Sequence, residues 1–158
     1  MQQTSSSLIV ARGPGTFSQV PVLDASVLVD CVAPDVPLTA RSPRTLARLS
    51  ATGEVILGPR LLLAECSNAL LMGIRKGRWS GAEADKAYGL LVGMPVKLAD
   101  DAQHLDRAWE LSRRYDNHPL YDMVYVAVAE AAGVDLITAD ESLRSRLGHL
   151  GWIKAPDA

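Results

Sequence analysis

The sequence contains no run of apolar residues that approaches the roughly 18 residues needed to cross a membrane. Residues 1–19 carry neither the basic start nor the apolar stretch of a secretory signal, and they are expected to form a flexible leader. Cysteine is also scarce. Cys31 and Cys66 have no CxxC pairing and no metal-like spacing, which favours free thiols in a reducing compartment. These absences predict a cytoplasmic protein without a membrane anchor.

Several common catalytic motifs are missing as well. There is no glycine-rich loop to hold phosphates and no motif for a serine or cysteine nucleophile. The three tryptophans are scattered, without the pattern of a base-stacking surface. The three histidines lack mutual spacing for a metal site, so surface or capping roles are expected for His104, His118 and His149. The carboxylates are therefore the remaining candidates for chemistry.

The sequence has no excess of basic charge, since its formal net charge at pH 7 is −2. Without the four candidate site acids described below, the remainder carries +2. Twelve of the 16 basic residues are arginine, which suits bidentate contact with phosphate, although solvated helix faces explain any single group more simply. The net charge therefore does not exclude a nucleic-acid partner, because the placement of charge matters more than its sum.

The chain length of 158 residues suits one ordinary domain. Hydrophobic periodicity, punctuated by proline and glycine, predicts strands that alternate with helices. Strands are expected at residues 20–23, 54–57, 95–98, 134–138 and 152–153, and helices at 27–33, 39–50, 60–75, 80–92, 101–115, 119–132 and 141–147. This alternation predicts a three-layer α/β/α domain over residues 20–154, with a mostly parallel central sheet and a tail of residues 155–158.

Two of the expected strands end on an aspartate. The strand at 20–23 runs into Asp24, and the small residues Ala25 and Ser26 leave room beside it. The strand at 134–138 is followed by Asp140, with the hydroxyl of Thr138 two residues earlier. Ligands of open α/β sheets bind outside the carboxyl ends of the strands, so both acids stand where chemistry is usual. Helix N-capping is the alternative explanation for each of them.

Two further acids lie in apolar helices. Glu65 is the only acid within residues 61–72, and Asn68 follows it by one turn on the same face. A carboxylate among leucines is costly to bury without a partner, although a solvent-facing stripe also explains this pair. Asp122 lies in the first turn of a helix, where the helix dipole alone favours an acid. The continuously apolar residues 123–129 nevertheless predict that this helix is buried on all sides.

These four acids suit a hard divalent cation. Carboxylate oxygens are preferred ligands of Mg²⁺ and Mn²⁺, and magnesium usually binds one or two carboxylates directly and keeps several waters. Four acids can therefore divide into direct and water-mediated ligands.

Four sequence blocks, taken in order, resemble the PIN domain and, more narrowly, the VapC-type ribonuclease toxins of bacterial toxin–antitoxin pairs. No single block is specific, but their order and intervals are similar to those of the family over roughly residues 20–153. The leader before Asp24 is longer than in the compact toxins. The blocks are VLDASVLVD at 22–30, AECSN at 64–68, YDMVYVAVA at 121–129 and LITAD at 136–140.

The resemblance implies a function and a site. Asp24, Glu65, Asp122 and Asp140 are implied as catalytic and metal-binding acids, with support from three polar residues, Ser26, Asn68 and Thr138. The implied reaction is Mg²⁺- or Mn²⁺-dependent hydrolysis of RNA phosphodiester bonds that leaves 5′-phosphate and 3′-hydroxyl ends. The implied partners are an RNA substrate, a cognate antitoxin protein and a second copy of the chain in a homodimer.

Two binding modules remain as alternatives from another class. A phospho-acceptor receiver needs a lysine at the end of its fourth strand, and no lysine stands there in this sequence. A PIN-like module that binds RNA or metal without cutting is harder to separate from a nuclease by sequence, because both can carry the same acids.

Overall fold

A five-stranded, entirely parallel sheet forms the centre of the protein. The computed structural model describes residues 20–157, so the expected leader lies outside the described residues. The strands run in the order β3-β2-β1-β4-β5. Their bounds are β1 (Val22–Leu23), β2 (Ile56–Pro59), β3 (Val96–Ala99), β4 (Leu136–Ile137) and β5 (Ile153–Lys154). The two residues of β1 and the two of β4 are almost fully buried, as in a sheet that is covered on both faces.

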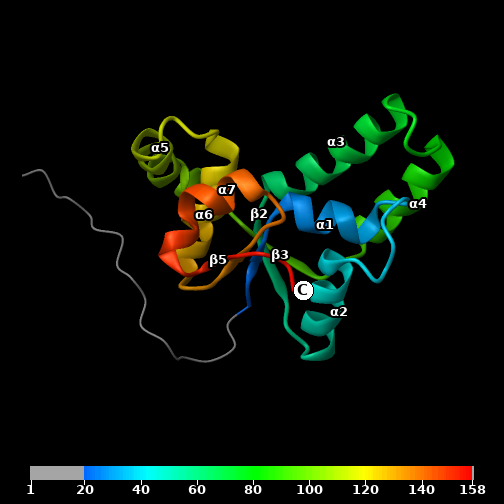
Figure 1. The fold of residues 1–158 in the computed structure, drawn as a ribbon, viewed down its shortest axis with the longest axis horizontal. Helices are drawn as coiled ribbons and strands as arrows, with labels where there is room; N and C mark the ends of the chain where they lie inside the picture. Colours follow the sequence, from blue (N-terminus) through cyan, green and yellow to red (C-terminus); the bar gives the residue numbers. More distant parts are fainter. Residues whose placement is uncertain (1–19, 158) are drawn as a thin grey trace, which may run out of the picture.

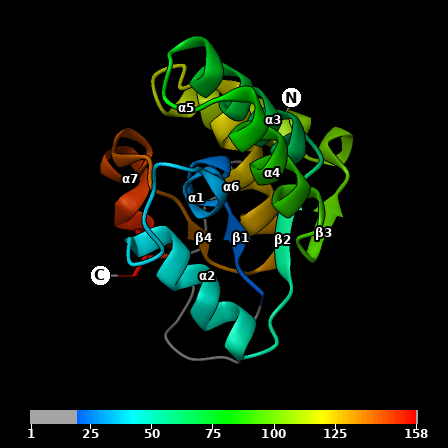
Figure 2. The ribbon, with the colours of Figure 1, turned by 90° about the vertical axis from the view of Figure 1, so that its right-hand side faces the viewer.

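Helices cover both faces of this sheet (Figure 1). The helices α1 to α4 lie on one side, which faces the viewer in Figure 2, and α5 to α7 lie on the other. Their bounds are α1 (Ala25–Val32), α2 (Arg41–Ala51), α3 (Leu61–Arg75), α4 (Gly81–Val92), α5 (Leu105–Arg114), α6 (Leu120–Ala132) and α7 (Glu141–Leu147). The expected α/β/α architecture is confirmed, and the sheet is wholly rather than mostly parallel.

The direction of the chain through the sheet reverses between β1 and β4. From β1 the chain moves outward through β2 to β3, with α1 to α4 on one face. It then returns across the sheet to β4 and continues to β5, with α5 to α7 on the opposite face. The carboxyl ends of β1 and β4 therefore flank the topological switch point, where open parallel sheets bind their ligands.

Two elements differ from the sequence-based expectation. The helix expected at 101–115 is divided into a short 3-10 turn (Asp101–Gln103) and α5. The carboxylate of Asp101 contacts a helix that is distant in the sequence. Its two oxygens accept hydrogen bonds from the backbone N–H groups of Arg60 at 2.6 Å and Leu61 at 2.9 Å, at the start of α3. This long-range contact caps a helix whose own N-cap residue provides no side-chain hydrogen bond.

The second strand also lies two residues later than expected. Gly58 and Pro59 lie beyond the expected strand, but they pair with Leu98 and Ala99 of β3. Because β1 ends at Leu23, opposite Gly58, the position of Pro59 has a strand neighbour on one side only. Proline is tolerated there because that point of the strand is locally an edge.

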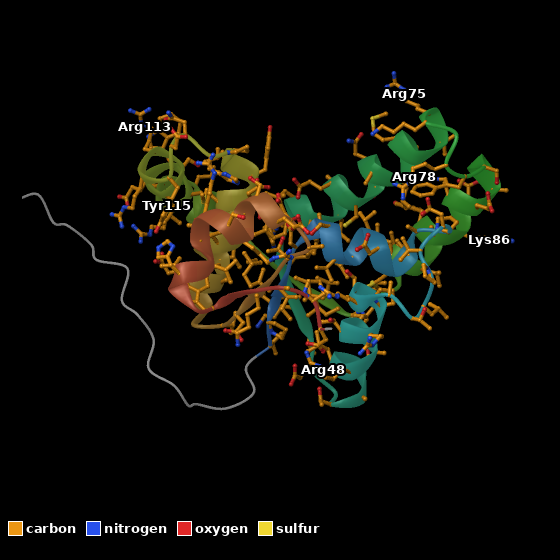
Figure 3. All side chains as sticks on the ribbon, viewed as in Figure 1. Arg48, Arg75, Arg78, Lys86, Arg113 and Tyr115 are labelled. Carbon is orange, nitrogen blue, oxygen red and sulfur yellow. The ribbon has the colours of Figure 1, made fainter. Side chains whose placement is uncertain are left out.

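The helices α3 and α4 pack side by side and extend beyond the sheet as an arm (Figures 1 and 3). A capping box of Ser80 and Glu83 begins α4. Just before it, Trp79 is buried, and its indole N–H donates to the Leu70 carbonyl at 2.9 Å. The indole ring lies directly against Gly73 of α3. Trp79 thereby fixes the angle at which α4 returns along α3.

None of the helices in residues 20–157 has the length and apolar character that a membrane span requires. Cys31 and Cys66 are both free, as expected.

Replacing Gly73 by alanine should destabilise the protein by about 1–3 kcal/mol, because a Cβ there would lie 1.9 Å from the Trp79 ring. The matched control is Gly89→Ala in the middle of α4, where nothing lies within 4 Å of the added Cβ. There the better helix propensity of alanine should leave stability unchanged or raise it by up to about 1 kcal/mol. Chemical denaturation of both variants measures the difference, and equal effects would contradict the packing described for the arm.

Candidate acidic active site

Asp24 is a buried carboxylate at the carboxyl end of β1. Its residue is 7% exposed, and one carboxylate oxygen, Oδ2, accepts two hydroxyl hydrogen bonds. The Ser26 hydroxyl donates at 2.5 Å and the Thr138 hydroxyl donates at 2.9 Å. Asp24 also occupies the N-cap position of α1, but its side chain makes no capping hydrogen bond. The recorded hydrogen bonds of this carboxylate are those from the two hydroxyls, and the N–H groups of Ala25 and Ser26 add a favourable interaction with its charge.

The same two hydroxyls connect the carboxyl end of β1 to that of β4. Ser26 Oγ accepts a hydrogen bond from the backbone N–H of Ala139 at 3.1 Å. Thr138 Oγ1 accepts one from the backbone N–H of Asp140 at 3.0 Å. Each hydroxyl thus accepts from the segment after β4 and donates to Asp24. This arrangement orients the carboxylate and holds the two strand ends together at the switch point.

Glu65 reaches the site from the first half of α3. Its Oε2 accepts a hydrogen bond at 2.5 Å from the hydroxyl of Tyr125, a fully buried side chain of α6. A buried tyrosine needs a partner for its hydroxyl, and Glu65 supplies it. Helices from opposite faces of the sheet therefore meet through this pair.

Asp122 lies in the first turn of α6, as expected. Its Oδ2 is 2.8 Å from Nε2 of His118, which lies one turn earlier and is 7% exposed. The prediction of a surface or capping role for His118 is therefore wrong, since this side chain is buried and contacts a candidate site acid. His118 lies before the start of α6, so helical spacing in the sequence does not predict this contact.

Asp140 follows β4 and caps the last helix. Its Oδ1 accepts hydrogen bonds from the backbone N–H groups of Ser142 at 2.8 Å and Leu143 at 3.2 Å, so the capping alternative describes a real contact. Arg144 of α7 donates to the Thr138 carbonyl at 2.8 Å and braces the same turn. Asp140 is thus held at the rim of the site by the helix that follows it.

Burial raises the pKa of three of these carboxyl groups, and for two of them the charges of neighbouring acids add to the shift. For Asp24, burial raises the pKa, while the hydroxyls of Ser26 and Thr138 and the nearby N–H dipoles of α1 oppose the shift. For Glu65, burial again comes first, and the charges of Asp24 and Asp122 add to it. For Asp122, burial raises the pKa against the contact with His118, and the charges of Asp24 and Asp140 raise it further. The four acids therefore share one electrostatic environment.

The donor chemistry of the site fits a hard divalent cation. The hydrogen bonds recorded for the carboxylates of Glu65, Asp122 and Asp140 in the described part of the chain involve one oxygen of each carboxylate. Within residues 20–157, no three His, Cys, Asp or Glu side chains converge closely enough to enclose an ion by themselves. Magnesium takes one or two carboxylates and completes its shell with water, so these acids suit a hydrated site rather than a closed protein cage.

The supporting residues behave differently from one another. Ser26 and Thr138 both contact Asp24 directly. Asn68 is exposed on α3, one turn after Glu65, and no hydrogen bond to a site acid is recorded for it in the described chain, so its role stays a prediction. Tyr125 was not expected at the site, because it lies within an apolar run that reads as core.

The fold and the site together define an α/β/α domain with an acidic centre at the switch point of its sheet. The chain belongs to the PIN domain family, whose pattern matches residues 22–146. It is 37% identical over 122 residues to Ribonuclease VapC3 of Mycobacterium tuberculosis, covering 77% of this chain and 83% of that protein. It is 30% identical over 128 residues to Ribonuclease VapC12 of the same species, covering 81% of this chain and 92% of that protein.

A solved structure has the same fold. It is the crystal structure of Mycobacterium tuberculosis VapC20, described as a sarcin-ricin loop cleaving toxin. The two structures superpose with a TM-score of 0.58 at 19% sequence identity, over 84% of this chain and 96% of that one. At this identity the likeness concerns the fold.

The raised pKa of Asp24 predicts a pH dependence of stability. The native state binds this proton more tightly than the unfolded state does, so the free energy of unfolding falls as pH rises from 3.8, the pKa of the unfolded group, through the raised native pKa. The substitution Asp24→Asn removes the titrating group and with it this fall in the free energy of unfolding. In EDTA its melting temperature should exceed that of the wild type at neutral pH, and the gap should shrink below the unfolded pKa.

Asp85→Asn, an exposed change on α4, is the control and should show no such pH-dependent gap. A loss of stability in Asp24→Asn that is equal at both pH values would mean that this acid serves only as a structural hydrogen-bond acceptor. Differential scanning fluorimetry across the pH range measures all three proteins.

Proposed function

We propose that the protein is a metal-dependent endoribonuclease, the toxin of a type II toxin–antitoxin pair, which hydrolyses RNA phosphodiester bonds. The observation that carries this proposal is the buried, hydroxyl-bound carboxylate of Asp24 at the switch point, whose charge raises the pKa of Glu65 and that of Asp122. Membership of the PIN domain family and similarity to two proteins named as ribonucleases support it.

In this proposal the four acids hold Mg²⁺ or Mn²⁺ and each has a distinct support. Asp24 is the central ligand, since two hydroxyls fix its carboxylate and favour its ionised form. Tyr125 orients Glu65, and His118 orients Asp122. Asp140 caps α7 through Oδ1, so only its other oxygen would be available to contact the cation, through a bound water.

The chemistry that such a cation supplies when bound is a hydroxide at neutral pH, an oriented scissile phosphate and neutralisation of charge on the leaving oxygen. The protein's own contribution is the fixed geometry of its carboxylates, which are held by hydrogen bonds before substrate arrives. Water attacks phosphorus, the bond to the ribose 3′ oxygen breaks, and the products carry 5′-phosphate and 3′-hydroxyl ends.

The proposed partners follow from the same site. A cognate antitoxin can place an arginine side chain among the four acids, where its charge replaces that of the cation. A homodimer of the chain is the proposed form of the free toxin.

Asp24→Asn, Glu65→Gln and Asp122→Asn should each remove most RNA cleavage with the fold intact, and Asp140→Asn should leave some activity. Tyr125→Phe should lower cleavage by about 10- to 100-fold, as loss of an outer partner does at metal sites. EDTA should abolish cleavage, and Mg²⁺ or Mn²⁺ should restore it. The assay follows a labelled RNA by gel, with circular dichroism as the check on folding.

Asp85→Asn serves again as the control and should cleave like the wild type. If the wild type binds RNA and Mn²⁺ but cuts nothing, the protein is the non-catalytic PIN-like module instead. Full activity of Asp24→Asn would falsify the assignment of the acidic site.

Co-expression with the protein encoded by the adjacent gene should relieve toxicity and yield a stable complex. In that complex, Mn²⁺ should no longer raise the melting temperature, because an arginine of the partner fills the acidic site. A free protein that is harmless to its host and monomeric at micromolar concentration would contradict the proposed partners.

A further inference from the structure

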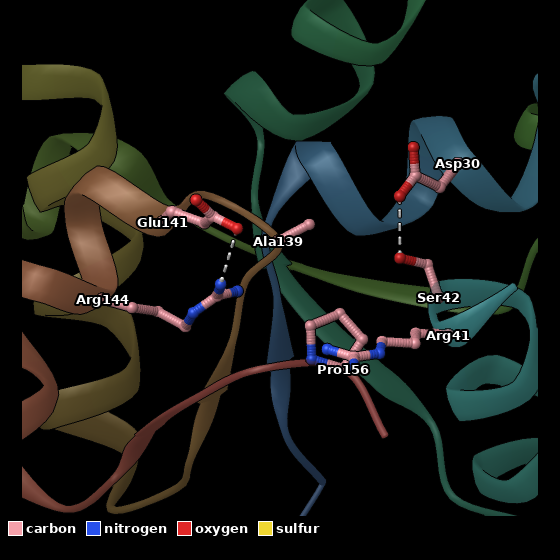
Figure 4. A pocket seen from close by; sticks show the side chains of 7 residues that line it. All are labelled: Asp30, Arg41, Ser42, Ala139, Glu141, Arg144 and Pro156. Carbon is pink, nitrogen blue, oxygen red and sulfur yellow. Dashed lines mark hydrogen bonds and ion pairs between the residues drawn. The ribbon is translucent and has the colours of Figure 1, made fainter. Parts of the chain in front are cut away.

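A pocket lies beside the acidic site and contains none of its four acids. Its volume is about 270 Å³. It is formed by residues of α1, α2 and α7, by the turn after β4 and by the C-terminal segment (Figure 4). The lining residues are Asp30, Arg41, Ser42, Ala139, Glu141, Arg144 and Pro156.

One residue of the pocket wall is adjacent in the sequence to two residues of the acidic site. Ala139, which forms part of its wall, stands between Thr138 and Asp140. The backbone N–H of Ala139 is bound to Ser26, which in turn donates to Asp24. A polymer that places one unit at Asp24 therefore has the pocket immediately to one side of it.

Two arginines reach into the pocket from opposite walls, Arg41 from α2 and Arg144 from α7 (Figure 4). Arg144 is fixed by its hydrogen bond to the Thr138 carbonyl at 2.8 Å. Its other contact, to Glu141, is long at 4.0 Å, and the Glu141 side chain is 91% exposed. No ion pair is recorded for Arg41 in the described part of the chain. Both guanidinium groups can therefore take an anion.

The remaining polar groups suit the sugar of a nucleotide rather than a second anion. Asp30 accepts a hydrogen bond from the Ser42 hydroxyl at 2.9 Å through one oxygen, which orients the carboxylate and leaves the other oxygen as an acceptor. A carboxylate repels anions but accepts hydrogen bonds from hydroxyl groups. The pocket thus offers two guanidinium groups for a phosphate and one carboxylate for a hydroxyl.

We propose that this pocket binds the nucleotide adjacent to the scissile bond, with its phosphate between Arg41 and Arg144 and its ribose 2′-hydroxyl donating to Asp30. This inference rests on the proposed function, because it assumes an RNA strand at Asp24. The phosphate contact supplies affinity and register on the strand. The 2′-hydroxyl contact supplies a preference for RNA over DNA, since only RNA carries that group.

The binding test uses the full chain with Asp24→Asn in EDTA, so that the RNA stays intact. A short fluorescein-labelled single-stranded RNA is titrated and followed by fluorescence anisotropy. Adding Arg41→Gln should weaken binding by about tenfold, the effect of losing a hydrogen bond to a charged group. The slope of the logarithm of affinity against the logarithm of salt concentration should fall by about 0.7, the contribution of one phosphate on a single strand.

Arg75→Gln is the matched control, because Arg75 is an exposed arginine at the outer end of α3, away from the pocket (Figure 3). It removes the same charge and should change affinity and salt slope much less than Arg41→Gln does. Equal losses in the two variants would show a diffuse charge effect and overturn the pocket. Arg41→Lys, which keeps the charge without the planar fork, should recover part of the affinity.

The sugar contact has its own test. DNA of the same sequence should bind the parent protein more weakly than RNA does, and Asp30→Asn should narrow this difference. An unchanged preference for RNA in Asp30→Asn would overturn the role of that carboxylate.

A titration with inorganic phosphate in EDTA separates this inference from the proposed function. Backbone amide NMR signals of Arg41 and Ser42 should shift in the wild type, and Arg41→Gln should suppress the shifts, whether or not the protein cuts RNA. Acetate at the same concentration should cause little shift, and equal shifts with acetate would mean a general anion site only. A protein that cleaves RNA normally with Arg41→Gln and shows no phosphate shifts would retain the proposed function and lose the pocket.

Discussion

The structure depends on keeping one carboxylate ionisable inside the protein at the point where two parallel strands end together. Burying a charge is costly unless hydrogen bonds replace the lost water, and Asp24 has two hydroxyl donors for this purpose. Those hydroxyls come from different ends of the chain and are themselves bound by the backbone after β4. The geometry of the acidic site is therefore set by backbone positions just beyond the carboxyl ends of β1 and β4.

Further acids lie near Asp24, and their negative charges repel one another when ionised. Glu65 and Asp122 arrive from helices on opposite faces of the sheet, and each is held by a buried aromatic side chain, Tyr125 or His118. The core beneath them is continuous and apolar, so its packing can offset the repulsion among the acids. Native proteins accept such local instability at functional sites, where a ligand of opposite charge relieves it.

Much of this arrangement could be predicted from local sequence patterns. The apolar run before Asp24 and the one before Asp140 predicted two buried strands, each with an acid at its carboxyl end. The alternation of strands and helices predicted that these strands are parallel, so that both acids lie at one edge of the sheet. The patterns did not reveal contacts between side chains that are distant in the sequence. Tyr125 reads as core because its hydroxyl partner, Glu65, lies 60 residues away. Asp101 reads as part of a helix because the α3 terminus that it caps lies 40 residues earlier. Such pairings depend on tertiary packing, which periodicity does not encode.

The hydrogen bond between Thr138 and Asp24 joins residues that are 114 positions apart in the chain. A ribosome synthesises nearly all of the α/β/α domain before this bond can form, because β1 must wait for β4 as its neighbour at the switch point. Until then Asp24 lacks one of its two hydroxyl donors, and Asp140 has not joined the other acids. A nascent chain that ends before β4 therefore has no complete acidic site, because Thr138 and Asp140 are not yet part of it. In a family of ribonucleases, such a chain order means that the acidic site is complete only when nearly the whole domain has been synthesised.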